Sequence, residues 1–333
     1  MKKIWIIALT TILAFTSGLL SADQQLSRKA TSGKNAALTY WQAFALLPEM
    51  SAKEEKILSD CRSAPLDKAS KKLVDKGKPS LRMLIRGAKY EYCNWQVHKE
   101  NGVEAIMPHL SKARTLIKFA ILRARWNFHQ NKPTEAIDDL MASLALARYG
   151  CANGPLISYL VQVAIEALVV QTTAEHLTRL DKGTLQNLAK RLNALPQGAS
   201  LATAFANEKE FLDAQKDDPL YKSALKLYEE LAGMAELPPQ EFEEKLKTIK
   251  NPALMPGIGK ISYQQAAART KMAMLKAAIA ILLEGKEKLR SIRDPYGDGS
   301  FEYMELKEGF RLRSSMKVTK GQERVSLTIG GGK

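Results

Sequence analysis

Three consecutive helical segments in the middle of the chain constrain its fold more than any other feature. They are predicted over Pro108–His129, Pro133–Tyr149 and Pro155–Leu180, with turns at Asn131-Lys132 and Gly150–Gly154. The third segment is apolar around most of its circumference, and such a helix is normally buried on nearly all sides. We therefore expect it at the centre of a helical body, with the two amphipathic helices packed against it.

Further helices are predicted on both sides of this centre. A capping box formed by Ser51 and Glu54 opens one of them. Gly77-Lys78-Pro79 reads as a helix stop followed by a helix start. The other predicted helices are Asn35–Leu47, Pro65–Asp75, Ser80–Tyr92, Thr184–Leu195, Ser200–Lys216, Pro219–Met234, Pro239–Lys250 and a long helix from Ser262 to about Ser291, preceded by a loop over Asn251–Ile261.

The character of the sequence changes at Asp294. Phe301–Leu306, Phe310–Val318 and Arg324–Ile329 are short and rich in β-forming residues, with turn signals between them. The chain therefore divides into a helical domain at 35–293, a β-hairpin or meander module at 294–329 and a disordered tail at 330–333.

The pair Ile117–Gln130 and Pro133–Tyr149 has tetratricopeptide-like features, namely small residues at the helix crossing and a tight turn. No second unit of this kind is evident. The predicted fold class is mainly α, an irregular and partly tetratricopeptide-like helical bundle or array with a small C-terminal antiparallel β meander.

The N-terminus predicts export. Met1–Ala22 has the positive, apolar and small-residue regions of a signal peptide, and residues 23–34 form a polar, flexible leader. An uncleaved anchor is the alternative. No transmembrane span is expected after cleavage, because the apolar segment Pro155–Leu180 still carries charged residues. The expected location is the periplasm or cell envelope.

The formal net charge is +15, and removal of Lys2 and Lys3 would leave +13. Such an excess favours polyanionic partners. The cations are interleaved with glutamates along most helices, however, and no basic-aromatic nucleic-acid module is present. We therefore expect these charges to form a solvated surface that does not recognise nucleic acid specifically.

The three cysteines lack the spacing of metal ligands. Cys61 and Cys93 flank short helices early in the chain and are the expected disulfide, which would leave Cys151 as a lone thiol.

No motif predicts a catalytic site or a cofactor. Glu166 lies on the apolar third helix in a polar seam with Ser158 and Gln162. A buried acid could act as a general acid. The expected interpretation is an ion pair with an arginine of the preceding helices, with Arg114, Arg123 and Arg125 as the candidates.

The segment Asp294–Glu305 partly matches a calcium-binding loop. Asp294, Asp298 and Glu305 occupy loop positions one, five and twelve. Pro295 and Tyr296 do not fit, and a turn leading into a hairpin is the preferred alternative.

Asp294-Pro295-Tyr296-Gly297, followed by Tyr303 and Gly309-Phe310, resembles the C-terminal hairpin of the major pseudopilins of type II secretion. This resemblance covers about the last tenth of the chain. Together with Tyr40–Phe44 and Leu156–Leu160, the same hairpin resembles exported helical proteins of planctomycete-type bacteria. The second resemblance implies a helical fold and export but no activity.

The functional expectation is an exported protein-interaction or scaffolding module whose partner is another envelope protein. One alternative is a hydrolase with a site assembled between helices around Glu166, and another is a polyanion-binding protein. Enzymatic activity is left uncertain and is less favoured than binding, and the sequence does not indicate the oligomeric state.

Overall fold

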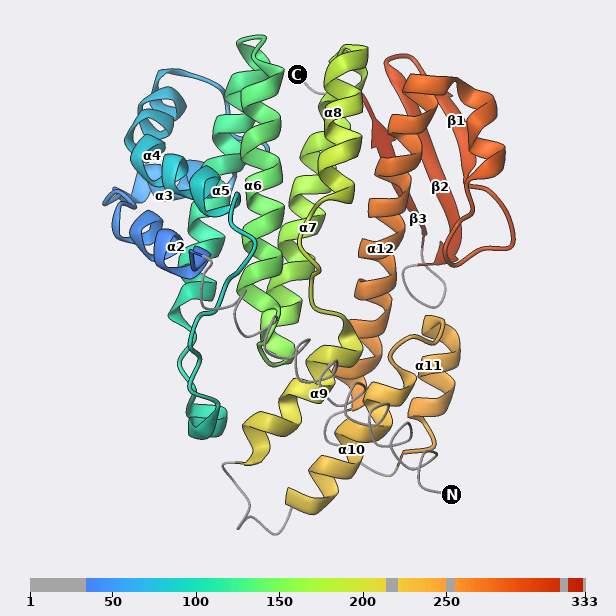
Figure 1. Cartoon of the computed structure of the whole chain (residues 1–333). Coiled ribbons are helices and arrows are strands. Elements are labelled where there is room, and N and C mark those ends of the chain that lie inside the picture. Colours follow the sequence, from blue (N-terminus) through green and yellow to red (C-terminus); the bar gives the residue numbers. More distant parts are fainter. Residues whose placement is uncertain (1–33, 214–220, 250–254, 318–322, 332–333) are drawn as a thin grey trace, which may run out of the picture.

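The computed structural model describes residues 34–213, 221–249, 255–317 and 323–331. It is mainly helical and ends in a three-stranded antiparallel sheet (Figure 1), which confirms the predicted mainly α class with a C-terminal meander. The predicted signal peptide and all but the last residue of the predicted leader lie outside the described residues.

Three long helices form the centre of the molecule, as predicted. They are α5 (Pro108–His129), α6 (Pro133–Cys151) and α7 (Leu156–His176), and they pack side by side (Figure 1). Proline begins both α5 and α6, where a missing backbone N–H removes no helical hydrogen bond. Asn131 makes the turn between them with φ of +55°, a conformation that asparagine adopts more readily than most residues. A short 3₁₀ turn, η2 (Leu177–Arg179), follows α7.

Helix α7 is less enclosed than its composition predicts. Its Ser158, Ile165 and Val169 are buried, whereas Ile157 is 54% exposed and Ala164 is also exposed. The expectation of burial on nearly all sides was therefore wrong: α5, α6, α9 (Leu201–Leu212), α12 (Met255–Glu284) and β3 (Arg324–Ile329) pack against the helix and still leave these two apolar residues exposed. Leu156–Arg179 is, among the described residues, the one helical stretch long and apolar enough to cross a membrane, a test that core helices of soluble proteins also pass.

The N-terminal helices pack on α5 and α6. They are α2 (Ala36–Ala45), α3 (Ala52–Ser59) and α4 (Lys68–Gly87), and the capping box of Ser51 and Glu54 is present. Helix α4 corrects a prediction, because it continues through Pro79 where two helices were expected. Gly77 lies where a Cβ atom would come within 2.6 Å of the Phe119 ring, so this glycine permits close packing of α4 on α5 rather than ending a helix. A later loop contains the 3₁₀ turn η1 (Lys99–Glu104).

The C-terminal helices include a second hydrophobic cluster. The elements are α8 (Lys182–Asn193), α9 (Leu201–Leu212), α10 (Tyr221–Met234), α11 (Pro239–Leu246), α12 (Met255–Glu284) and the 3₁₀ turn η4 (Lys286–Ser291). We distinguish two groups of buried residues. The larger core contains buried residues of α2 to α8, of α12 and of the sheet. The smaller cluster consists of Tyr159, Leu201, Ala204, Phe205, Leu227, Leu231, Ala235, Phe242, Leu246 and Ile258. Helix α12 begins at Met255, inside the predicted loop, and ends at Glu284 before the 3₁₀ turn.

Two side chains of α9 tie the smaller cluster to the start of α7. Glu208 accepts a hydrogen bond of 2.7 Å from the backbone N–H of Leu156, and Asn207 donates one of 2.9 Å to the carbonyl of Gly154. Burial raises the pKa of the Glu208 carboxyl. Polar ties of this kind supplement the apolar contact that Tyr159 makes with the smaller cluster.

The sheet has the order β1 (Glu302–Leu306), β2 (Gly309–Lys317) and β3 (Arg324–Ile329), so the predicted meander is confirmed. Tyr303 and Phe310 stack with ring centroids 5.0 Å apart. The sheet packs on α7 and α12 (Figure 1). The backbone N–H of Gly330 donates to the carbonyl of Ala174 at 2.9 Å, so the chain is still anchored where the tail was predicted to begin.

Candidate functional site

A groove runs along helix α6. It consists of two adjoining hollows of about 400 and 600 Å³. Both hollows are lined by Ala88 and Lys89 on one side and by Ala194 and Pro196 on the other, so they form one continuous depression. One wall is the end of α4 with residues 88–93, the floor is α6, and the other wall is the end of α8 with residues 194–197.

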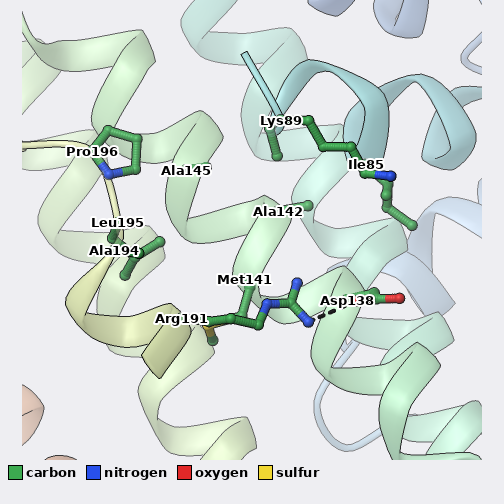
Figure 2. A pocket seen from close by; sticks show the side chains of 11 residues that line it. Ile85, Lys89, Asp138, Met141, Ala142, Ala145, Arg191, Ala194, Leu195 and Pro196 are labelled. Carbon is green, nitrogen blue, oxygen red and sulfur yellow. Dashed lines mark hydrogen bonds and ion pairs between the residues drawn. The ribbon is translucent and has the colours of Figure 1, made fainter. Parts of the chain in front are cut away.

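The first hollow is shown in Figure 2. Met141, Ala142 and Ala145 of α6 form its floor, and the small alanine side chains deepen it. Ile85 and Leu195 add apolar surface from the two walls. Arg191 donates to Asp138 at 2.6 Å and places an ion pair beside this apolar floor.

More of the side chains that line the second hollow carry a polar group. It is lined by Tyr90, Tyr92, Cys93 and Tyr149, together with Glu91, Asn153 and Gln197. The hydroxyl of Tyr149 donates to the carbonyl of Tyr90 at 2.5 Å and fixes the wall against α6. Burial raises the pKa of the Cys93 thiol to about 12, so it is protonated at neutral pH and is a weak nucleophile.

Glu166 helps to hold the other wall. Arg148 donates to Glu166 at 2.9 Å and to the carbonyl of Pro196 at 2.9 Å. Gln162 also accepts from the backbone N–H of Ala199 at 3.0 Å. The predicted polar seam is confirmed, since Ser158 and Gln162 are buried beside Glu166 on one face of α7.

The arginine partner of Glu166 was not among the candidates. Arg123 pairs with Asp139, and Arg125 donates to the carbonyls of Cys61 and Ala64. Arg148 lies in the last turn of α6, and its side chain reaches Glu166 in the middle of α7, which packs against α6. Because its carboxylate is held by Arg148, Glu166 positions the groove wall.

The fully buried acid with a raised pKa is Asp139, which the sequence interpretation missed. Its side chain is fully buried, and desolvation raises its pKa to about 6, although the Arg123 guanidinium opposes this shift. Asp139 is one of two adjacent aspartates on an amphipathic helix, and only the arginine sixteen residues earlier hints at its pairing.

The predicted disulfide is absent, because Cys61, Cys93 and Cys151 are all free. Arg125 of α5 donates to the carbonyl of Cys61, whereas Cys93 lines the second hollow together with Tyr149 of α6, so the two cysteines have different surroundings.

The calcium candidates do not converge. Asp294 is buried and accepts hydrogen bonds from the backbone of Tyr296 at 3.1 Å, from the Ser314 hydroxyl at 2.5 Å and from the backbone of Ser315 at 3.1 Å. Glu305 pairs with Phe310, about 14 Å along β2 from Ser314 at the strand rise of 3.4 Å per residue. Asp298 is exposed. Asp294 therefore joins the helical body to the sheet.

The histidines are separated. His109 stacks on Trp95 and contacts the carbonyl of Gly150, whereas His176 stacks on Phe128. His98 contacts Glu100, and His129 lies near Trp126. Among the described residues no group of three His, Cys, Asp or Glu side chains could hold a metal ion.

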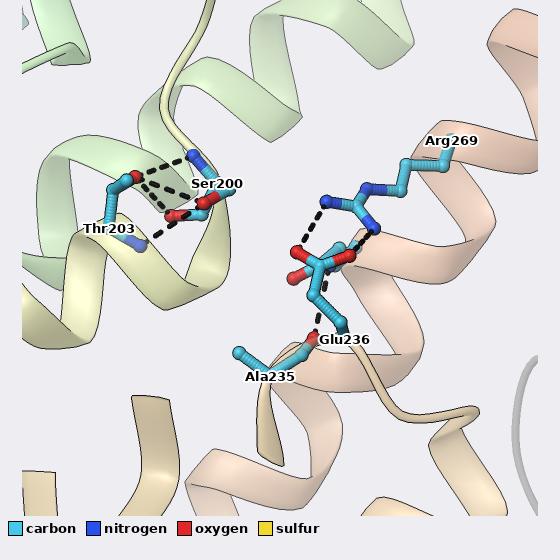
Figure 3. Close-up of polar contacts among 6 residues, drawn as sticks. Ser200, Thr203, Ala235, Glu236 and Arg269 are labelled. Atoms are coloured by element: carbon cyan, nitrogen blue, oxygen red, sulfur yellow. Dashed lines mark hydrogen bonds and ion pairs between the residues drawn. The ribbon is translucent and has the colours of Figure 1, made fainter. Parts of the chain in front are cut away.

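Figure 3 shows contacts that position the smaller cluster. Ser200 and Thr203 cap the start of α9, and Arg269 of α12 donates to both carboxylate oxygens of Glu236, at 2.7 and 3.0 Å. The Gln265 side chain donates to the carbonyl of Ala235 at 3.4 Å. The contacts of Arg269 and Gln265 join the end of α10 to α12, and they lie outside the groove.

The groove offers apolar surface, tyrosine side chains and an ion pair. Comparisons with protein-family models, curated proteins and solved structures found none that matches this chain.

Proposed function

We propose that this protein is an exported protein-interaction module and that the groove along α6 binds an extended segment of a partner protein. The observation that carries this proposal is the continuity of the two hollows over an apolar floor. The α5–α6 pair would be the tetratricopeptide-like unit of the helical body, with α4 and α8 forming the sides of its binding surface.

The size of the groove suits an extended peptide. Its floor extends from Asp138 to Asn153, or about 22 Å at the helical rise. An extended chain covers this length with about six or seven residues. Such a segment could place apolar side chains over Met141 and Ala145, with polar side chains toward Lys89 and Glu91.

The polar side chains at the two ends of the groove can orient a bound peptide. The Asp138–Arg191 pair lies at one end and the tyrosine hydroxyls lie at the other, so the two ends differ in chemistry. Binding sites that combine an apolar centre with a polar rim gain affinity from the centre and specificity from the rim.

We propose that the protein acts in the periplasm or cell envelope and that its partner is another envelope protein. This part rests on the signal-peptide pattern of Met1–Ala22 and on the resemblance to exported helical proteins.

Groove-filling substitutions test the proposal. Ala194 is exposed and Ala152 is half-buried, and both line the groove. Peptides selected from a random display library against the purified full-length protein should bind at micromolar affinity. Ala194→Trp and Ala152→Trp should each weaken this binding at least tenfold, because the indole would occupy the hollow.

Ala164→Trp is the matched control, because Ala164 is an exposed alanine on α7 that does not line the groove. Selected peptides that bind all three variants with unchanged affinity would show that the groove is not the binding site. Thermal melting of each variant separates lost binding from lost folding.

A further inference from the structure

Helix α4 carries most of its charge on one exposed face. It contains seven lysines and arginines and one aspartate, a net charge of +6 in 20 residues. Each of these cations has another three or four residues away, so they form one row along the outer face, with a gap between Lys72 and Lys78. We call this row, with the residue that follows the helix, the basic stripe: Lys68, Lys71, Lys72, Lys78, Arg82, Arg86 and Lys89.

Much of the basic stripe is exposed and available to bind a ligand. Lys71 and Lys78 share Asp75, and Arg86 donates to the Tyr90 hydroxyl at 3.2 Å. No ion pair involves Lys68, Lys72, Arg82 or Lys89 within the part of the chain that the structure describes, and all four are exposed. Repulsion along such a row is relieved when an anionic ligand binds.

A shallow pocket of about 640 Å³ lies at the beginning of the basic stripe. It is lined by Trp126 and Leu66, by the three cations Lys68, Lys71 and Lys72, and by the carboxylates Asp67 and Asp75. The Lys71 ammonium lies 6.0 Å from the centroid of the Trp126 ring. The pocket therefore combines an aromatic ring with three cations and two carboxylates at one end of a row of positive charge, and of its lysines Lys68 and Lys72 have no ion pair within the described residues.

We propose that the basic stripe and the Trp126 pocket bind a linear anionic polysaccharide. The C–H face of a sugar ring would lie on the Trp126 ring, whose face carries partial negative charge. Sulfate or carboxylate groups along the polymer would pair with successive cations of α4. The basic stripe is about 30 Å long at the helical rise, so several sugar units would be engaged at once.

Two other classes of polyanion fit less well. A membrane surface usually receives large apolar side chains from the protein. Among the described residues, the large exposed ones, Leu38, Trp41, Leu46, Ile106 and Ile157, all lie outside the basic stripe. Single-stranded nucleic acid is normally bound by successive aromatic platforms, whereas only one ring lines this pocket.

The test uses the full chain with heparin and polygalacturonate, which carry sulfate and carboxylate groups respectively. Binding is measured by calorimetry at several salt concentrations. We expect one or both polysaccharides to bind, with an affinity that falls as salt rises, because counterions are released on binding. The triple variant Lys68→Gln, Lys72→Gln, Arg82→Gln should bind at least tenfold more weakly.

The matched control is Lys112→Gln, Lys182→Gln, Lys190→Gln. These three lysines are exposed and lie on α5 and α8, and their removal lowers the net charge by the same amount. The control should lose less than twofold in affinity. An equal loss in both triple variants would mean that overall charge, and not the basic stripe, attracts the polymer.

Trp126→Leu tests the sugar contact. It should weaken polysaccharide binding at least threefold and leave the binding of polyglutamate, an anionic polymer without sugar rings, unchanged. Polyglutamate or phosphatidylglycerol vesicles that bind as tightly as both polysaccharides would overturn the proposal, as would the absence of polysaccharide binding. Lys89 belongs to both surfaces, but none of these variants changes a residue that lines the groove, so the two proposals are tested separately.

Discussion

The larger core and the smaller cluster are stabilised in different ways. The larger core combines fully buried side chains from α4, α5, α6 and α7 with the buried Arg123–Asp139 pair. The smaller cluster has fewer buried side chains, and its connections to the remainder include partly exposed pairs such as Arg269–Glu236. This difference predicts that the smaller cluster opens first, while the groove on α6 stays folded.

The largest effect is expected from Phe119→Ala in the larger core. Phe119 is fully buried and packs against Gly77, so its removal leaves a cavity between α4 and α5. Such truncations cost about 3–5 kcal/mol. Chemical denaturation should show this loss in the free energy of global unfolding, and a loss below about 1 kcal/mol would contradict the described packing.

Phe205→Ala makes the same change in the smaller cluster. Phe205 is also fully buried, and the local loss should again be about 3–5 kcal/mol. Hydrogen exchange should accelerate in α9, α10 and α11 while the amides of α5 and α6 keep their protection. Equal acceleration in both regions would mean that the two regions unfold together.

Glu166→Gln should cost about 1–3 kcal/mol, because Arg148 loses its charged partner. The wall at residues 194–199 should loosen, and peptide binding in the groove should weaken with it. Glu241→Gln is a suitable control, because Glu241 is an exposed glutamate of α11. Unchanged stability and unchanged peptide affinity in Glu166→Gln would contradict the positioning role.

The buried side chain of His176 should make the stability of the fold sensitive to acid. Burial lowers its pKa from 6.5 to about 4, so between these values the unfolded chain binds more protons than the folded one. The contribution of neutral, buried His176 to the free energy of unfolding is complete above pH 6.5 and is lost as the pH falls toward 4. At pH 5 the loss is about 1–2 kcal/mol.

Denaturation of His176→Gln at pH 7 and pH 5 isolates this contribution. The variant should lose less stability between the two values than the unmodified protein does. Asp139 acts in the opposite direction, since its raised pKa favours the folded state below about pH 4 and this contribution is lost as the pH rises through 6. Equal pH dependence of the variant and the unmodified protein would rule out His176 as the acid-sensitive group.

The smallest effect is expected from Arg269→Met. The Arg269–Glu236 pair is bidentate but partly exposed, and pairs of this kind contribute about 0.2–1 kcal/mol. Hydrogen exchange in α10 should rise slightly, and more at low salt than at high salt. A loss above about 2 kcal/mol would show that this pair, rather than the apolar contacts of Phe205, holds the smaller cluster in place.

Local signals in the sequence predicted the helices and the meander well. Proline at the first position located α5 and α6, and the Ser51 capping box located α3. The same local signals failed at Pro79, because packing of Gly77 on Phe119 favours one continuous helix. The end of α12 was placed too late, since Gly285 adopts φ of +96° there.

The candidate sites depend on contacts between distant segments. The polar seam of Ser158, Gln162 and Glu166 follows from helical spacing, but its partner Arg148 depends on how α6 meets α7. Nothing in the local sequence indicates that residues 88–93 and 194–197 face each other across α6. The charge row of α4 could have been found from its spacing, had the segment been recognised as one helix.

The glycines of α4 also help to fix the distance between the Trp126 pocket and the groove. Gly77 and Gly87 each let an aromatic ring, of Phe119 and Tyr40 respectively, approach within 2.6 Å of the position of a Cβ atom. Helix α4 is thereby seated closely at two points, and it fixes the Trp126 pocket about 30 Å from Lys89 at the groove. A partner that carried both a groove-binding peptide and an attached acidic glycan would bind bivalently. Its avidity would be greatest when the linker matches this span, because the effective concentration of the second group then peaks.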